Sequence, residues 1–207
     1  MMLRGSQSWW LLCGLLGAGC VLVWHLPVDA QLALRWQASS WREQPWTLWS
    51  AAFTHLNAAH LSVNLLALLC LCIIGAYSGN GAGAGAREAL ALLIAWPLTH
   101  LALLLWPQVQ FYAGLSSLNH AVAGIIAAKF AIELIVNKHF QMISFLLTLM
   151  LTAKLLWEAA WIEPLRADAN WGFTVVQAAH LSGFLAGIVS LLIVSQLIRK
   201  HAIHPSQ

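Results

Sequence analysis

Six long, continuously apolar runs limit what this chain can fold into. They cover residues 9–26, 48–77, 88–106, 114–136, 140–161 and 173–198. An α-helix needs roughly 20 apolar residues to cross the hydrocarbon core of a membrane, and the runs are of that order. Barrel strands would be about 10 residues long and alternate in polarity, which these runs do not. We therefore predict an all-α membrane protein whose six transmembrane helices form one bundle, with residues 1–207 as a single domain.

Composition agrees with a multi-pass membrane protein and argues against a nucleic-acid-binding one. Hydrophobic residues make up 60% of the chain and charged residues 8%, whereas soluble domains contain about 25% charged residues. The net charge is +3 at pH 7, and the basic residues are scattered at the ends of the apolar runs. Lipid is therefore the expected environment, and no nucleic-acid partner is expected.

The distribution of basic residues predicts the orientation in the membrane. An even number of helices places both termini on one side. That side holds the termini and the second and fourth loops, which carry Arg4, Arg87, Lys138, Arg199 and Lys200. On the opposite side, acidic residues balance the basic ones. By the positive-inside rule, we expect both termini in the cytoplasm.

A hydroxyl and an imidazole within the apolar runs are the strongest indication of chemistry. Ser116 lies at the start of the fourth run, and His180 lies inside the sixth. Polar side chains are costly in lipid, and these two groups together suffice for nucleophilic catalysis. Each alone has a structural interpretation, because serine is common in helix interfaces and a buried histidine can bond to a neighbouring helix.

Two further polar residues match the needs of acyl transfer. His60 and Asn64 are four residues apart, so both project from one face of the second helix. Their side chains can donate hydrogen bonds to an oxyanion, a contact worth about 3 kcal/mol in hydrolases. The backbone amide of Ser116, free at a helix N-terminus, can add another donor. Gly114 lets the preceding backbone turn tightly.

Small residues predict that the fourth and sixth helices pack closely. Gly183 and Gly187 form a Gly-x-x-x-Gly stripe after His180. The fourth helix carries a matching track of Ser117, Ala121, Gly124 and Ala128. Such stripes allow close helix approach in lipid. We expect this packing to bring His180 within hydrogen-bonding reach of Ser116.

No carboxylate is expected beside His180. Glu133 lies toward the inner end of the fourth helix, and Glu158 and Glu163 lie near the outer end of the fifth. A serine–histidine dyad is therefore favoured over a triad. Metal catalysis is disfavoured because His55 and His60 lack the i, i+4 spacing of a zinc-binding helix. We expect neither a metal nor an organic cofactor.

Three motifs, in order along the chain, resemble those of rhomboid intramembrane serine proteases. They are Phe-Thr-His-Leu-Asn-Ala-Ala-His-Leu-Ser-Val-Asn at 53–64, Gly-Leu-Ser-Ser at 114–117 and Ala-His-Leu-Ser-Gly-Phe-Leu-Ala-Gly at 179–187. The resemblance covers about residues 46–198, the six-helix rhomboid core. It implies an intramembrane endopeptidase with Ser116 as nucleophile and His180 as general base. It also implies that His60 and Asn64 are the oxyanion donors.

Two positions depart from the rhomboid pattern. Ser117 stands where the Gly-x-Ser-Gly pattern has its second glycine, a small change that should preserve close packing. Trp46-Thr47 stands where Trp-Arg is usual. The role of that arginine in the outer loop is therefore lost, or it has moved to Arg42.

Two features resemble the rhombosortase branch of the superfamily: a histidine four residues after Ser116, His120, and the short length of the chain. That resemblance implies a bacterial inner-membrane enzyme with its active site open to the periplasm. Its substrates would be transmembrane segments with a GlyGly-type C-terminal signal, namely a glycine-containing motif, an apolar helix and a basic end. His120 and Asn119 are expected to contact substrate or tune the nucleophile. Water, or the amine of a membrane lipid, would resolve the acyl-enzyme.

Two other functions fit the same residues. One is a non-catalytic rhomboid-like protein that binds transmembrane helices, although intact Ser116 and His180 count against it. The other is a proton-coupled transporter in which His60, His120 and His180 form a relay. For His120, the alternative is a purely structural role in a hydrogen bond between helices.

Overall fold

Long helices make up most of the computed structural model, which describes residues 6–78, 83–136, 138 and 140–203. In these ranges the long helices are α1 (Gln7–Trp24), α4 (Ala58–Tyr77), α5 (Ala86–Leu101), α6 (Ser116–Val136), α7 (Met142–Glu158) and α8 (Gln177–Ile203). Five described segments are long and apolar enough to cross a membrane: all of these helices except α7, with α5 continued by the 3-10 turn η2 (Ala102–Leu105). The protein is therefore a multi-pass, mostly helical membrane protein. A sixth crossing by the 17-residue α7 remains a prediction.

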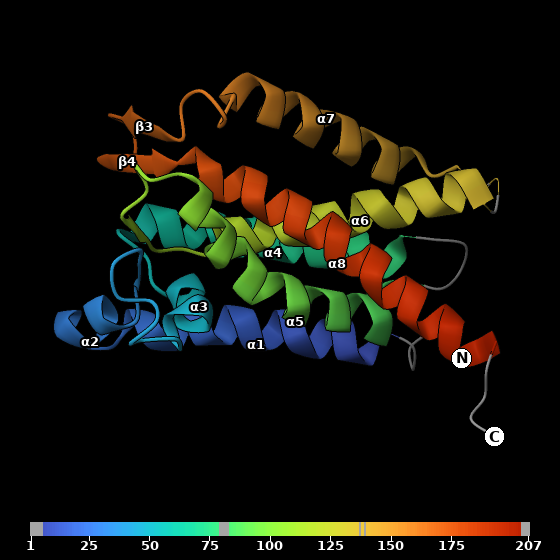
Figure 1. The fold of residues 1–207 in the computed structure, drawn as a ribbon, viewed down its shortest axis with the longest axis horizontal. Coiled ribbons are helices and arrows are strands. Elements are labelled where there is room, and N and C mark those ends of the chain that lie inside the picture. The colour runs from blue at the N-terminus through green and yellow to red at the C-terminus, as the bar shows by residue number, and fades with distance from the viewer. Residues whose placement is uncertain (1–5, 79–82, 137, 139, 204–207) are drawn as a thin grey trace.

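The long helices lie side by side along one axis, and the short elements gather at one end (Figure 1). These short elements include α2 (Val28–Ala33), α3 (Thr47–Ser50) and the 3-10 turn η1 (Ala51–Phe53). The start of α1 and the end of α8 lie at the opposite end (Figure 1). The end with the short elements therefore corresponds to the predicted outer side. The terminal residues and Lys200 side chain, on which the cytoplasmic placement partly depends, fall outside the described residues.

Two small antiparallel sheets add strands to the predicted all-α fold. Strand β1 (Trp36–Gln37) pairs with β2 (Phe111–Tyr112), and β3 (Leu165–Asp168) forms a hairpin with β4 (Phe173–Val176). The predicted start of the sixth helix at residue 173 is therefore wrong, because α8 begins at Gln177. Aromatic and β-branched side chains favour strand over helix in β4. Gly172, at φ +69°, supplies the left-handed turn between the strands.

The second apolar run is also not one continuous helix. After α3 and η1 the backbone becomes extended at Thr54, and α4 starts only at Ala58. Asn57 caps α4, since its side-chain oxygen accepts a hydrogen bond from the backbone N–H of His60 at 2.8 Å. Asparagine is a preferred N-cap because its oxygen satisfies an otherwise unpaired amide. The break places His60 in the first turn of α4.

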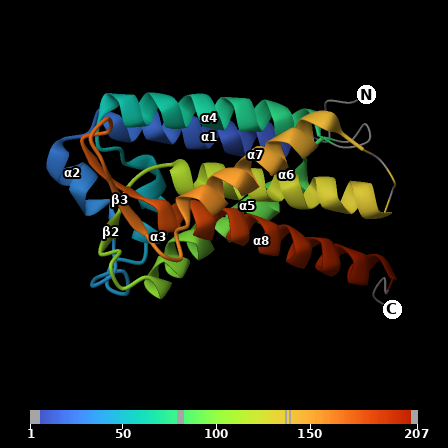
Figure 2. The ribbon, with the colours of Figure 1, turned by 90° about the horizontal axis from the view of Figure 1, so that it is seen from above.

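Helix α6 occupies the centre of the bundle. It packs against α4, α5, α7 and α8 (Figure 2). Its closest neighbour is α8, because a Cβ atom added to Gly183 would lie 2.0 Å from the carbonyl oxygen of Ser117. One turn deeper, a Cβ on Gly187 would lie 2.1 Å from the carbonyl oxygen of Ala121. The two small-residue tracks therefore face each other with their backbones in contact.

A methyl group at Gly187 should force α6 and α8 apart. We expect Gly187→Ala to destabilise the protein by about 1–3 kcal/mol, in spite of the higher helix propensity of alanine, because the backbone of Ala121 cannot move aside. Thermal unfolding in detergent, followed by tryptophan fluorescence, measures the effect. Gly14→Ala is the matched control, since nothing lies within 4 Å of a Cβ at that position. Equal melting temperatures for the two variants would contradict the prediction.

Candidate active site

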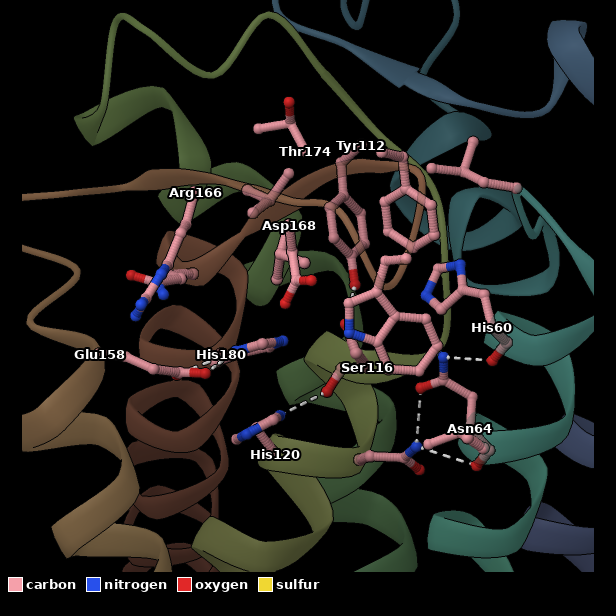
Figure 3. A pocket seen from close by; sticks show the side chains of 18 of the residues that line it. His60, Asn64, Tyr112, Ser116, His120, Glu158, Arg166, Asp168, Thr174 and His180 are labelled. Atoms are coloured by element: carbon pink, nitrogen blue, oxygen red, sulfur yellow. Dashed lines mark hydrogen bonds and ion pairs between the residues drawn. The ribbon is translucent and has the colours of Figure 1, made fainter.

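A cavity of about 460 Å³ opens at the end of the bundle that carries the strands. Helices α4, α6, α7 and α8 and the β3–β4 hairpin supply its walls (Figure 3). All six polar residues that the sequence singled out line it, namely His60, Asn64, Ser116, Asn119, His120 and His180. In the view of Figure 3, Ser116 lies between His180 on one side and His60 with Asn64 on the other.

Ser116 is the first residue of α6, and the turn before it requires glycine. Gly114 has φ +130°, a conformation that other residues rarely adopt. A Cβ atom at Gly114 would also lie 2.7 Å from Cε1 of His60. The absence of a side chain at this position therefore lets the His60 ring approach the turn that leads into Ser116.

Tyr112 holds the Ser116 hydroxyl, a role that sequence reasoning missed. The backbone N–H of Ser117 donates to the Tyr112 hydroxyl oxygen at 2.9 Å, and that hydroxyl lies 3.0 Å from Ser116 Oγ. In the described part of the chain, Ser116 Oγ is the one acceptor in reach of the phenol hydrogen. Burial raises the pKa of Tyr112, so the phenol keeps this hydrogen. Ser116 thus accepts from Tyr112 and retains its own proton for a base.

Ser117, the departure from the rhomboid pattern, adds an anchor for the start of α6. Its hydroxyl lies 3.3 Å from Nε2 of His100, and Nδ1 of the same ring lies 2.6 Å from the carbonyl oxygen of Leu48. Since a carbonyl only accepts, Nδ1 carries the hydrogen and Nε2 accepts from Ser117. The start of α6 is thereby tied to α5 and α3.

His180 is paired with a carboxylate, which corrects the sequence-based expectation. Nδ1 of His180 lies 3.0 Å from each carboxylate oxygen of Glu158. The expectation that no acid would reach His180 is wrong, because the last turn of α7 packs beside the first turns of α8 and directs Glu158 toward the ring (Figure 3). Among the described residues, no hydrogen bond joins Ser116 to His180; Nδ1 of His180 faces Glu158 instead.

His120 stacks on His180. The ring centroids are 4.3 Å apart and the planes differ by 17°. Nδ1 of His120 lies 2.7 Å from the carbonyl oxygen of Ser116, and Nε2 lies 3.2 Å from Nζ of Lys154. His120 therefore uses both ring nitrogens in contacts, one with Ser116 and one with Lys154, and covers one face of the His180 imidazole.

The opposite wall holds the two expected oxyanion donors. Nδ1 of His60 is buried without a hydrogen-bond partner, and its ring packs against Phe173 with centroids 4.9 Å apart. Nδ2 of Asn64 donates to the carbonyl oxygen of His60 at 2.9 Å. Asn119 in turn donates to the Asn64 side chain at 3.1 Å. Asn119 thus supports Asn64, which keeps one amide hydrogen that these bonds do not use.

Lys154 and Glu158 form the part of the site that a sequence signal could have revealed. They are an i, i+4 pair 2.5 Å apart in an otherwise apolar run. Ionisable residues in such a run are expensive and are therefore functional candidates by default. Within the described ranges, no cluster of three or more His, Cys, Asp or Glu side chains forms a metal site.

Comparison with known proteins gives one family. The family model of the Rhomboid domain matches residues 42–197. This span contains every residue described above as lining the cavity. A comparison with curated proteins found no match.

Loss of the Tyr112 hydroxyl should destabilise the start of α6. In Tyr112→Phe the buried N–H of Ser117 loses its acceptor, which costs about 1–3 kcal/mol. We expect a lower melting temperature in detergent. Tyr77→Phe serves as the control because Tyr77 is 78% exposed. A Tyr112→Phe protein as stable as the Tyr77→Phe protein would show that this hydroxyl is not the acceptor.

Proposed function

Because the chain belongs to the rhomboid family of intramembrane serine proteases, we propose that it is a serine endopeptidase that cleaves transmembrane protein substrates. One observation carries this proposal. Ser116 and His180, the hydroxyl and imidazole expected to act together, line one cavity at the end of a bundle of membrane-spanning helices. A soluble hydrolase would not place this pair among lipid-facing helices.

Ser116 is the proposed nucleophile and His180 the proposed general base. During attack on a substrate carbonyl, His180 takes the Ser116 proton and then gives it to the leaving amine. The resting structure has Ser116 bonded to Tyr112 instead. Catalytic hydrogen bonds commonly tighten only when substrate is bound. A small rotation of the serine side chain toward His180 is therefore part of the proposed reaction.

His60, Asn64 and the Ser116 backbone amide are the proposed oxyanion donors. The buried, unpartnered Nδ1 of His60 and the remaining amide hydrogen of Asn64 support this role. Ser116 begins α6, so its N–H belongs to the amides that an α-helix leaves unpaired. Removal of one such donor typically lowers kcat by about 10²–10³-fold.

The substrate is proposed to enter sideways, between α4 and α7. Helix α7 lies at the edge of the bundle, and its buried side chains are Ser144, Leu155 and Glu158. Its outer face is apolar, with Met150 70% exposed and Leu156 62% exposed. A lipid-embedded helix can therefore reach the cavity without crossing water. A hydrogen-bonded helix hides its carbonyls, so the substrate has to unwind near Ser116.

Within the family, we propose that the protein belongs to the rhombosortase branch of bacterial inner-membrane enzymes that open to the periplasm. His120, four residues after Ser116 and stacked on His180, supports this assignment. The proposed substrates carry a GlyGly-type C-terminal signal. Glycine weakens a helix by about 1 kcal/mol per residue, which favours unwinding at the scissile bond. Water or an amine-bearing lipid then resolves the acyl-enzyme.

A non-catalytic helix-binding protein is the second candidate. The observation that favours it is the resting hydrogen bond of Ser116 to Tyr112 rather than to His180. The two functions differ in whether Ser116 reacts. A reagent that reports serine nucleophilicity without knowledge of the substrate therefore separates them.

Ser116→Ala and His180→Ala should each abolish covalent labelling by a fluorophosphonate probe. The first change removes the attacking oxygen, and the second removes its base. Labelling of the purified full-length protein is read by in-gel fluorescence and intact mass. Ser62→Ala and His25→Ala are the matched controls, since both side chains are exposed. A wild-type protein that stays unlabelled while folded would favour the non-catalytic function.

Cleavage of a co-expressed substrate should depend on its glycines. A periplasmic reporter with a Gly-Gly motif, an apolar helix and a basic end should be cut, and replacement of both glycines by leucine should reduce cleavage about 10-fold or more, because about 2 kcal/mol of helix destabilisation is lost. His120→Ala should reduce cleavage of the intact signal. Equal cleavage of both reporters would refute the glycine preference. The mass of the new C-terminus distinguishes hydrolysis from amine transfer.

A further inference from the structure

Three polar side chains, Glu158, Lys154 and His120, meet beside the proposed base His180. Glu158, His180 and His120 are at most 9% exposed. Lys154 Nζ lies 2.5 Å from Glu158 Oε1 and 3.2 Å from Nε2 of His120. The cluster contains one carboxylate, Glu158, and one ammonium group, Lys154. Neither has a role in the serine–histidine dyad proposed above. A buried carboxylate costs free energy unless it is paired and hydrogen-bonded.

The hydrogen-bond partners indicate which nitrogen of each ring carries a proton. Nδ1 of His120 faces the Ser116 carbonyl, so it carries hydrogen and Nε2 accepts from Lys154. Nδ1 of His180 lies 3.0 Å from both carboxylate oxygens of Glu158 and 3.2 Å from the Lys154 ammonium. The two shorter contacts are to acceptors, so they favour hydrogen on Nδ1 over acceptance from Lys154. Nε2 of His180 is therefore left as a free lone pair. A general base needs this tautomer.

The position of Glu158 is unfavourable unless it serves a neighbour. It is the last residue of α7, where the negative end of the helix dipole repels a carboxylate. Ala159 follows it in the left-handed conformation, at φ +45°, which alanine adopts rarely. The Gln177 amide, oriented with its nitrogen toward the backbone, donates to the Glu158 carbonyl oxygen at 2.7 Å. The end of α7 is thus secured against the start of α8, three residues before His180.

We propose that Glu158 is a positioning residue that orients His180, so that Ser116, His180 and Glu158 form a triad, and that Lys154 holds Glu158 in place. This inference rests on the proposed protease function. Lys154 also donates to His120, which stacks on the His180 ring. The ring is therefore fixed by a hydrogen bond at its edge and by a packed ring at its face.

Each step of the reaction uses this arrangement. As Ser116 Oγ bonds to the substrate carbonyl carbon, its proton moves to Nε2 of His180, and the π electron pair of the carbonyl moves to oxygen. His180 then carries two N–H groups, and the Nδ1 hydrogen remains bonded to the Glu158 carboxylate, which balances the new positive charge. As an oxyanion electron pair re-forms the C=O bond, the C–N bond breaks; its electron pair stays on nitrogen, which takes the Nε2 proton.

The positive charge of Lys154 makes the Glu158 carboxylate necessary for His180 to accept a proton. Its ammonium lies 3.2 Å from Nδ1 of His180 and opposes positive charge on that ring. The other charged or titratable groups that line the cavity are His60 on α4, Tyr112 on β2, His120 on α6, and Arg166 and Asp168 on the hairpin. Without the Glu158 charge, the ammonium would face the developing imidazolium uncompensated. Glu158 therefore orients the His180 ring and offsets the positive charge of Lys154.

The rate of fluorophosphonate labelling at Ser116 tests the proposal without a known substrate. Glu158→Gln keeps the shape but removes the charge and allows the opposite tautomer of His180, so labelling should slow by roughly 100-fold or more. Glu158→Asp retains the charge and should recover part of that loss. Glu163→Gln is the matched control, because Glu163 is exposed in the loop that follows α7, and should label at the wild-type rate. A wild-type rate for Glu158→Gln overturns the triad.

The tautomer of His180 provides a second test that needs only the wild-type protein. Nitrogen-15 NMR of the histidine-labelled full chain, assigned by comparison with His180→Ala, should show hydrogen on Nδ1. Hydrogen on Nε2 overturns the proposal even if Glu158→Gln does not fold. Absence of any Ser116-dependent labelling in the wild type contradicts the protease function instead, while the tautomer still reports whether Glu158 orients the ring.

Discussion

The backbone contact between α6 and α8 is the constraint on which the rest of the structure depends. Lipid tails are as apolar as leucine, so no hydrophobic force pulls these helices together, and van der Waals packing has to hold them. Gly183 and Gly187 allow that packing because their missing Cβ atoms leave room for carbonyl oxygens of α6. The contact brings the first turns of both helices to one depth. Ser116 and His180 share a cavity as a result.

A continuous set of hydrogen bonds follows from the same packing. It links Leu48, His100, Ser117, Tyr112, Ser116, His120, Lys154, Glu158 and His180. In a low-dielectric interior an unpaired polar group is costly, so a complete network is stable and a broken one is not. Residues from α3, α5, α6, α7 and α8, together with Tyr112 of β2, thereby hold one serine and one imidazole in their resting orientations. The rigidity of the site comes from this network rather than from any single bond.

Residue patterns predicted the long helices and most of the residues that line the cavity. These features depend on the length of the apolar runs, the polarity of single positions and the size of the side chains. Ser116 at a helix start, the facing small residues and the shared face of His60 and Asn64 all follow from local periodicity. The hairpin at 165–176 was missed because its second strand is as apolar as the helix that follows. Glu158 was misplaced because its contact with His180 depends on how α7 leans against α8, and no spacing within one helix specifies that angle. Tyr112 has no distinguishing pattern at all.

The β3–β4 hairpin also connects distant parts of the site mechanically. Strand β4 ends at Val176, and α8 begins at the next residue, so no flexible connector separates them. At the other end of the hairpin, the carbonyl oxygen of Trp171 accepts a hydrogen bond from the Asn57 side chain at 2.9 Å, beside the start of α4. The hairpin is thus held at both ends, at Asn57 by a hydrogen bond and at α8 by its direct connection. Any displacement of its tip away from Asn57 would therefore also act on the first turn of α8, which carries His180.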